Sequence, residues 1–306
     1  MTHFGDRLYD AVARTGTPVL VGLDPRLENL PSTLRRDVSE TDPHTIAVAF
    51  TRFCCDVIDV VAPLVPAVKP QAAFFEQLGP AGMQALAETV LHARQRGLLV
   101  IMDGKRNDIG STAAAYGDAY LGESSVWGAD ALTVSPYLGD DSLVPFFDVA
   151  SQRGAGVFVL VKTSNPGGGL FQDLVADANP LYRHVADYVE ARASESLGTH
   201  GYGLVGAVVG ATYPKQLVEL RSAMPHTWIL VPGFGAQGGT AKDVAAAFDE
   251  QGQGAIVNSS RAIIFAHARP EFKDSFGDQR WQGAVEAATR LMIDQLRAET
   301  PAGKLD

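Results

Sequence analysis

Apolar and polar positions divide the chain into repeating blocks, each an apolar run of five to seven residues followed by a stretch of helical character. The runs are continuously apolar, which is typical of strands buried on both faces of a parallel sheet. Eight such runs are predicted as strands, at residues 18–24, 65–70, 97–102, 130–134, 156–162, 204–210, 227–232 and 254–259. Helices are predicted at residues 45–62, 79–96, 111–127, 142–153, 180–196, 214–223, 240–250 and 281–299.

Eight strand–helix units without a break in composition predict one (β/α)₈ TIM barrel spanning residues 1–306, in preference to two doubly wound domains. The length of 306 residues, 46% of them hydrophobic, allows a large core. Two stretches are longer than a minimal barrel needs, near residues 26–44 and 165–180. They are compatible with lids or dimer elements and equally with surface insertions.

The third apolar run leads into a charged segment, Asp103-Gly104-Lys105-Arg106-Asn107-Asp108, with the pattern Asp-x-Lys-x-x-Asp. If the strand continues through Lys105, Asp103 and Lys105 project to the same side, and a lysine and a carboxylate share one wall of a pocket. Asp108 follows the strand, where a loop can bring it toward the same lysine or toward a partner subunit. A surface ion-pair cluster is the alternative, but charges at the mouth of a core more often serve a ligand.

Polar residues and glycines also follow other predicted strands. In a TIM barrel the site forms at the carboxyl ends of the strands, so these side chains are expected to converge there. They are Asp24, Lys69, Asp103, Lys105, Ser164, Gly233 and Arg261.

A glycine-rich segment at residues 232–239 contains Gly-x-Gly-x-x-Gly, formed by Gly233, Gly235 and Gly238. The motif formally matches a dinucleotide-binding fingerprint. It follows six earlier strand–helix units and lacks an acidic residue about twenty positions further on, which argues against that interpretation. In a barrel, the loops after the seventh and eighth strands commonly bind a phosphate, and Arg261 would supply a bidentate positive charge.

Composition narrows the class of protein further. A net charge of −10 argues against a broad nucleic-acid-binding surface. No membrane-spanning segment or secretory signal is evident, and sparing use of cysteine, only Cys54 and Cys55, is compatible with a cytoplasmic protein. The seven histidines show no close metal-ligand spacing, so no metal is expected.

Together these motifs resemble the orotidine 5′-phosphate decarboxylase family, in its longer bacterial branch (type 2), from Val21 to about Phe265. The resemblance rests on Gly22-Leu23-Asp24, Val68-Lys69-Pro70, the Asp-x-Lys-x-x-Asp-Ile run with Thr112, Thr163-Ser164-Asn165-Pro166, the segment from Pro232 to Gly239, and Ser260-Arg261. The Asp-x-Lys-x-x-Asp run alone is shared with sugar-phosphate relatives. Where shorter family members often carry a histidine after the fourth strand, this chain has residues 135–139, Ser-Pro-Tyr-Leu-Gly.

The resemblance implies a cofactor-free, metal-free decarboxylation of orotidine 5′-monophosphate to UMP, the last step of de novo pyrimidine nucleotide synthesis, by a homodimer whose site is shared across the interface. It implies a catalytic network of Lys105, the proton donor, with Lys69, Asp103 and Asp108. Substrate-binding positions implied by the resemblance are Asp24, Ile109, Thr112, Ser164, Pro232, Gly233, Gly235, Gln237, Gly238, Ser260 and Arg261.

Two other functions remain open from the sequence. One is a related sugar-phosphate decarboxylase or aldol-type enzyme, which typically needs Mg²⁺ or a Schiff-base lysine. The other is a non-catalytic barrel that binds a phosphosugar.

Overall fold

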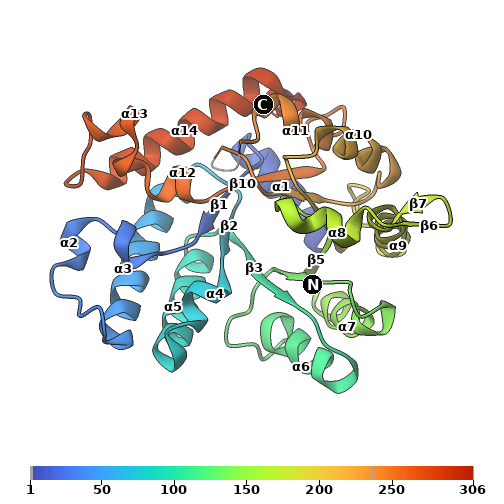
Figure 1. Cartoon of the computed structure of the whole chain (residues 1–306), viewed down its shortest axis with the longest axis horizontal. Coiled ribbons are helices and arrows are strands. Elements are labelled where there is room, and N and C mark those ends of the chain that lie inside the picture. The colour runs from blue at the N-terminus through green and yellow to red at the C-terminus, as the bar shows by residue number, and fades with distance from the viewer. Residues whose placement is uncertain (1–2, 236–237, 306) are drawn as a thin grey trace.

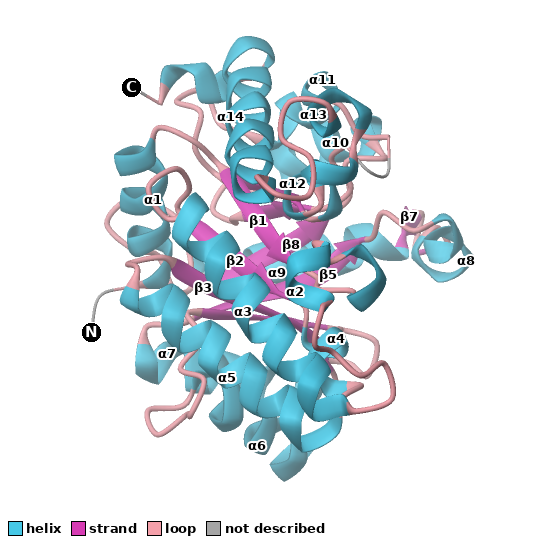
Figure 2. Cartoon of the chain, turned by 90° about the vertical axis from the view of Figure 1, so that its left-hand side faces the viewer, coloured by secondary structure: helices cyan, strands magenta, loops and turns pink. Residues whose placement is uncertain are grey.

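The computed structural model describes residues 3–235 and 238–305. Eight parallel strands form a closed barrel in the order β1-β10-β9-β8-β5-β4-β3-β2. Figure 1 shows the helices arranged around these strands, and Figure 2 shows the strands at the centre of the molecule. The barrel strands are β1 (Val19–Leu23), β2 (Ala67–Pro70), β3 (Leu99–Arg106), β4 (Ala131–Val134), β5 (Gly156–Lys162), β8 (Val205–Val209), β9 (Ile229–Val231) and β10 (Ala255–Ser259).

Each barrel strand coincides with one of the eight predicted apolar runs. Every residue of β1, β2, β4, β8, β9 and β10 is buried, because the barrel interior covers one face and the helices cover the other. The predicted TIM barrel is therefore confirmed. The longer helices are α1 (Phe4–Thr15), α3 (Pro43–Val61), α5 (Gly79–Gln95), α6 (Gly110–Leu121), α7 (Val144–Arg153), α9 (Leu181–Ser194), α10 (Pro214–Ala223) and α14 (Trp281–Glu299).

Two predicted helices are shorter than the sequence pattern suggested. The helix expected at residues 111–127 ends at Leu121, where the Ser125 hydroxyl donates to the Ala119 carbonyl and accepts from the Gly128 N–H. The helix expected at residues 240–250 ends after α11 (Ala241–Val244) and one 3₁₀ turn, because the Asp249 side chain binds the N–H groups that follow it. The other short helices are α2 (Ser32–Arg35), α4 (Ala72–Glu76), α8 (Gly169–Gln172), α12 (Arg261–Ile264) and α13 (Pro270–Lys273).

The amino-terminal end of the barrel is closed by α1, a helix that lies outside the predicted strand–helix repeat. Phe4 is 1% exposed, and its ring packs edge-on against Phe158 with 5.9 Å between the ring centroids. A Cβ at Gly156 would lie 2.2 Å from the Phe4 ring, so only glycine leaves room for it. The Trp228 indole donates to the Gly5 carbonyl at 3.3 Å. These contacts seal the end of the barrel opposite the carboxyl ends of the strands.

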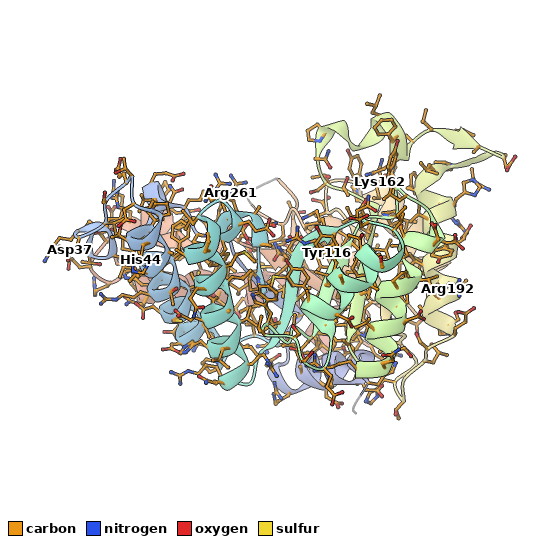
Figure 3. The ribbon with its side chains drawn as sticks, turned by 90° about the horizontal axis from the view of Figure 1, so that it is seen from below. Asp37, His44, Tyr116, Lys162, Arg192 and Arg261 are labelled. Carbon is orange, nitrogen blue, oxygen red and sulfur yellow. The ribbon has the colours of Figure 1, made fainter. Side chains whose placement is uncertain are left out.

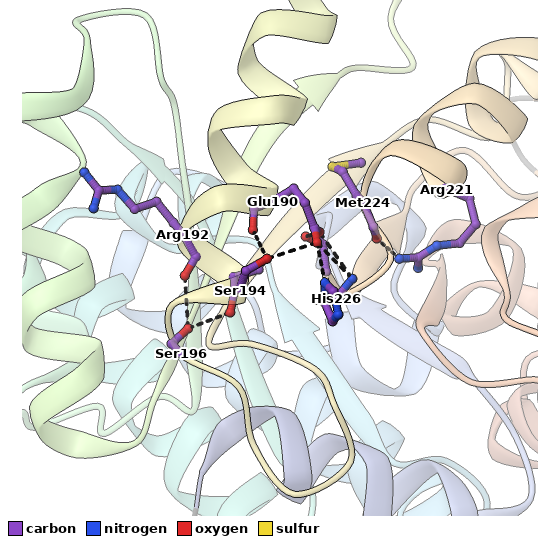
Figure 4. A network of polar contacts seen from close by, with 9 residues as sticks. Glu190, Arg192, Ser194, Ser196, Arg221, Met224 and His226 are labelled. Carbon is purple, nitrogen blue, oxygen red and sulfur yellow. Dashed lines mark hydrogen bonds and ion pairs between the residues drawn. The ribbon is translucent and has the colours of Figure 1, made fainter.

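A polar network joins α9 to the loop that precedes β9 (Figure 4). The Glu190 carboxylate accepts from the Thr227 hydroxyl at 2.9 Å and lies 2.6 Å from Nδ1 of His226. It also accepts from the Ser194 hydroxyl at 3.2 Å. Because Thr227 is fully buried, these bonds satisfy polar groups that would otherwise lose their hydration.

The two predicted insertions have different forms. Residues 26–44 contain a 3₁₀ turn and α2, and the Ser32 N–H donates to the Asp278 carboxylate at 2.9 Å. Residues 165–180 contain α8 and a two-stranded hairpin of β6 (Val175–Ala176) and β7 (Asn179–Pro180). Figure 2 shows α8 and β7 projecting away from the barrel.

Candidate active site

A cavity of about 750 Å³ lies at the carboxyl ends of the barrel strands. Of the residues predicted from the sequence, it is lined by Asp24, Lys69, Asp103, Lys105, Ser164, Pro232, Gly233, Ser260 and Arg261. These residues come from six of the eight strand ends, and only the barrel brings them together. The convergence is that expected for a TIM-barrel site.

At the base of the cavity, the Asp103 carboxylate is shared by two lysines. Lys69 Nζ lies 2.6 Å from Oδ2 of Asp103, and Lys105 Nζ lies 2.6 Å from Oδ1. Lys69 and Asp103 are 4% and 6% exposed, whereas the Lys105 side chain is 46% exposed. One lysine is therefore buried against the carboxylate, and the other presents its ammonium group to the cavity.

The charges in this cluster stabilise one another. Burial by itself raises the pKa of Asp103, but the positive charges and hydrogen bonds of Lys69 and Lys105 hold that pKa well below its usual range. Burial lowers the pKa of Lys69, yet the carboxylates of Asp103 and Asp24 outweigh this effect and raise it. Both groups consequently remain ionised at neutral pH.

The backbone of Lys105 has an unusual conformation for a lysine, with a φ of 44°. A non-glycine residue in this region costs about 1–3 kcal/mol and persists only where the surroundings hold it. Thr133 on β4 provides that support: its hydroxyl accepts from the Lys105 N–H at 2.9 Å and donates to Oδ1 of Asp103 at 3.0 Å. The register of β3 against β4 shifts between Met102 and Arg106, at the same place.

Arg106, next in sequence, anchors the end of β3 on the outside of the barrel. Its guanidinium donates to the Tyr120 hydroxyl on α6 at 2.6 Å and to the Glu76 carboxylate on α4. The end of β3 is thus held from both sides, by Thr133 toward the cavity and by these helices behind it.

Several polar residues of the cavity were missed by the sequence analysis. Gln71 donates to Oδ2 of Asp103 at 3.0 Å, and Thr133 contacts Oδ1. Arg26 places its guanidinium over the Phe74 ring, 5.0 Å from the centroid. All three lie at or just after strand ends, which is the signal that could have identified them, but nothing in the sequence distinguishes them from other residues there.

The glycine-rich loop after β9 has the backbone geometry that its sequence requires. Gly233, Gly235 and Gly238 have φ angles of 98°, 71° and 92°, in the region that favours glycine. Gly235 and Gly238 line a neighbouring cavity of about 700 Å³, and Arg261 lines both cavities. Gln237, also predicted for this loop, lies outside the described residues. Because the loop belongs to a closed barrel, the dinucleotide-fold alternative is wrong.

Ser260 approaches the first strand closely. A Cβ at Gly22 would lie 1.8 Å from the Ser260 hydroxyl oxygen, so glycine at this position leaves the space that Ser260 occupies. Arg261 begins α12 directly afterwards. Figure 3 shows Arg261 on the same side of the molecule as Lys162, the last residue of β5.

The structure does not bring Asp108, Ile109 and Thr112 into the cavity. The Asp108 carboxylate accepts from the Ile109 N–H at 2.9 Å, and Ile109 is 55% exposed. Thr112 lies on the exposed side of α6. Their placement at a subunit interface stays a prediction.

Within the described ranges, no group of three or more histidine, cysteine or acidic residues is arranged to hold a metal ion. Among the helices of residues 3–235 and 238–305, none combines the length and apolar character that crossing a membrane requires.

A closed barrel of eight parallel strands, with a charged cavity at their carboxyl ends, is the architecture of a TIM-barrel enzyme. Residues 17–272 match the model of the family described as "Orotidine 5'-phosphate decarboxylase / HUMPS family". The chain belongs to this family, as its motifs predicted.

Individual relatives agree with this assignment. The chain is 62% identical over 301 residues to an orotidine 5′-phosphate decarboxylase from Rhodopirellula baltica, covering 97% of this chain and 100% of the relative. It is 39% identical over 277 residues to one from Caldicellulosiruptor bescii, covering 87% and 91%. The solved structure of Leishmania donovani OMP decarboxylase superposes with a TM-score of 0.75 at 32% identity, covering 97% of this chain and 99% of that one.

We expect Asp103→Asn to lower the free energy of unfolding by about 3–5 kcal/mol near neutral pH, because the change leaves the buried Lys69 charge uncompensated. The folded state lowers the pKa of Asp103 from its ordinary value of 3.8. The contribution of the Asp103 carboxylate to the free energy of unfolding is therefore fully present above that pH and is lost as the pH falls through the folded-state pKa. Urea unfolding of the wild type and of Asp103→Asn at pH 7 and pH 3 measures the difference in the free energy of unfolding, which should be smaller at pH 3.

The matched control is Asp59→Asn, which removes an exposed carboxylate 2.8 Å from Arg96 and should cost less than about 1 kcal/mol. An Asp103→Asn protein that is as stable as wild type at pH 7 would contradict the expectation.

Proposed function

We propose that this protein decarboxylates orotidine 5′-monophosphate to UMP, the last step of de novo pyrimidine nucleotide synthesis. The observation that carries the proposal is the Lys69–Asp103–Lys105 cluster at the base of a cavity that also contains Arg261. The names of the relatives support it, since each is described as acting on this substrate. We place the reaction in the cytoplasm, in accord with the two free cysteines.

The chemistry requires a cation at the base of the cavity. Loss of CO₂ from C6 of the pyrimidine leaves the electron pair of the broken bond on C6, where no adjacent carbonyl can accept it. Stabilising this carbanion is the enzyme's main task, and enzymes supply about 8–23 kcal/mol for such tasks. The Lys105 ammonium offsets the charge, donates a proton from Nζ to form the new C6–H bond, and later regains a proton from solvent.

The rigidity of the cluster makes this step efficient. Asp103 holds the Lys105 ammonium at 2.6 Å, and Thr133 holds the Lys105 backbone, so little reorganisation is needed when the charge develops. Asp103 is itself fixed by Lys69 and Gln71. The proton donor is thus positioned before the substrate arrives.

The remaining residues of the cavity are assigned to the rest of the nucleotide. Asp24 and Lys69 contact the ribose; Oδ1 of Asp24 is buried without a hydrogen-bond partner among the described residues, as expected for an oxygen that accepts from a ribose hydroxyl. Ser164 faces the pyrimidine. The phosphate is bound by Arg261 and Ser260 with the loop containing Pro232, Gly233, Gly235, Gln237 and Gly238. Binding energy from the phosphate, remote from C6, orients the ring.

A homodimer completes the site in this proposal. Asp108 reaches the partner's substrate, with Ile109 and Thr112 contacting it across the interface. The 55% exposure of Ile109, an apolar residue beside the charged segment, supports an interface there. Near the substrate carboxylate, Asp108 would also add repulsion that is relieved when CO₂ leaves.

A sugar-phosphate decarboxylase or aldol-type activity is the second candidate, because the matched family description also includes the HUMPS group. Such an enzyme typically requires Mg²⁺ or a Schiff-base lysine. A non-catalytic barrel would bind UMP without consuming orotidine 5′-monophosphate.

The direct test follows the loss of orotidine 5′-monophosphate absorbance in buffer containing EDTA. We expect turnover that neither the chelator nor borohydride treatment reduces, because the proposed step uses only Lys105 and bound charges. Inhibition by either reagent would contradict a step that needs neither a metal nor a Schiff base. Failure to consume orotidine 5′-monophosphate would favour the second candidate, or the binding barrel if UMP still binds.

Lys105→Ala is expected to lower kcat by at least about 10³-fold, since the change removes both a proton donor and a placed charge. UMP binding should remain measurable by calorimetry, because the phosphate and ribose contacts are intact. Lys215→Ala, which alters an exposed lysine at the start of α10, is the control and should leave kcat unchanged. A Lys105→Ala enzyme with near wild-type kcat would refute the assignment of Lys105.

The shared site can be tested by mixing two inactive variants, Lys105→Ala and Asp108→Asn. If Asp108 acts across the interface, each mixed dimer has one intact site, and activity returns to about one quarter of wild type at equal amounts. If Asp108 acts within its own chain, both sites of a mixed dimer are defective and no activity returns.

A further inference from the structure

A buried lysine beside the site is not used by the proposed chemistry. Lys162, the last residue of β5, has a fully buried side chain, yet it does not line the cavity. Its ammonium donates a hydrogen bond to Oδ1 of Asp173, which lies just after α8. A buried charge is costly unless it is paired, so this ion pair fixes where Asp173 can lie.

Two aromatic rings complete the surroundings of the Lys162 ammonium. Nζ lies 4.6 Å from the centroid of the Tyr213 ring and 5.3 Å from that of Tyr182. Both distances are within the range of cation–π attraction. The Lys162 side chain is therefore held by two loops and a helix, and Asp173 binds to a cation that cannot easily move.

Two hydrogen bonds between Gln172 and Thr163 lie beside the Lys162–Asp173 ion pair. Oε1 of Gln172 accepts from the Thr163 N–H at 3.0 Å, and its Nε2 donates to the Thr163 hydroxyl at 2.7 Å. Gln172 and Asp173 thus bind back onto Thr163 and Lys162, which closes residues 163–172 into a loop. Ser164 lies in this loop and lines the cavity.

The position of Ser164 is also fixed from the β8 side. Its carbonyl accepts from the Thr212 hydroxyl at 3.2 Å, and a Cβ at Gly210 would lie 2.7 Å from the Ser164 Cα. Ser164 is therefore held on one side by the loop after β8 and on the other by the Gln172 hydrogen bonds and the Lys162–Asp173 ion pair.

Apolar burial does little to hold the rest of the insertion in place. Leu170, Phe171, Leu174 and Val175 are 70%, 53%, 57% and 71% exposed. Figure 3 shows this segment projecting beyond the barrel on the side where Lys162 and Arg261 are labelled. The ion pair and the Gln172 bonds are the strong contacts that connect it to β5.

We propose that Lys162 and Asp173 form a clasp that holds the loop after β5 closed and positions Ser164 against the pyrimidine. Both are positioning residues, because they act through Ser164 and touch no reacting atom. The inference rests on the proposed function, in which Ser164 contacts the base. Breaking the clasp lets the loop leave its closed position, and the apparent affinity for nucleotide then falls with the fraction of closed molecules.

The test is a double-mutant cycle between Asp173→Asn and Ser164→Ala, measured as kcat/KM for orotidine 5′-monophosphate. We expect Asp173→Asn to lower kcat/KM by about tenfold and to raise the Kd for UMP similarly. In the wild-type background Ser164→Ala should cost about tenfold, but in the Asp173→Asn background less than about threefold, because the serine is already displaced. Additive losses would overturn the clasp as a positioning device.

A second variant separates positioning from folding. Asp173→Asn leaves the Lys162 charge buried and unpaired, whereas Lys162→Met with Asp173→Asn removes both charges and should restore the melting temperature. We expect kcat/KM of this double variant to stay as low as that of Asp173→Asn. If kcat/KM recovers together with the melting temperature, the ion pair has only a structural role and the proposal is overturned.

Asp187→Asn is the matched control, because Asp187 forms an exposed ion pair with Arg183 on α9 at 2.9 Å and should leave kcat/KM unchanged. A wild-type protein that never consumes orotidine 5′-monophosphate would refute the proposed function. If the wild-type protein turns over orotidine 5′-monophosphate and Asp173→Asn leaves kcat/KM unchanged, the clasp is refuted but the proposed function is not.

Discussion

The carboxylate of Asp103, with an ammonium group at 2.6 Å from each of its oxygens, is the interaction on which the geometry of the site depends. It makes a buried Lys69 possible, since that charge would otherwise lack a partner. It also fixes the direction of Lys105, whose backbone adopts a conformation that is unfavourable for lysine. Thr133 contacts both Asp103 and Lys105, so one hydroxyl links the charge network to the strained backbone.

The barrel separates structural from chemical roles. Its amino-terminal end is filled by rings from Phe4, Phe158 and Trp228, and the loop before β9 is tied to α9 by Glu190. Its carboxyl-terminal end is lined by charged and hydrogen-bonding groups around an open cavity. Side chains at the closed end are determined by packing alone, because ligands bind at the opposite end of a TIM barrel.

Much of the fold could be predicted from the sequence because buried parallel strands leave continuous apolar runs, and each of the eight runs is a strand of the barrel. Asp103 and Lys105 could be paired because they are two residues apart on one strand. The association of Lys69 with Asp103 was implied by the family resemblance alone, because it depends on the register of β2 beside β3, which no local pattern specifies. Thr133 and the Lys162–Asp173 pair escaped prediction because their contacts also depend on how neighbouring strands and loops are placed, and the role of Asp108 at a subunit interface stays a prediction. The α1 helix was overlooked although its apolar spacing is amphipathic, because a single short helix before the first strand is not part of the repeat.

The pairing of the first strand with the last has a consequence for how the protein is made. Val19 lies opposite Val257, and Ser260 occupies the space beside Gly22, so the cavity is complete only when the first and last barrel strands have paired. During translation, the residues around Lys105 leave the ribosome long before β10 does. The complete cavity therefore forms only after β10 has been synthesised and has paired with β1, although Lys69, Asp103 and Lys105 are made much earlier.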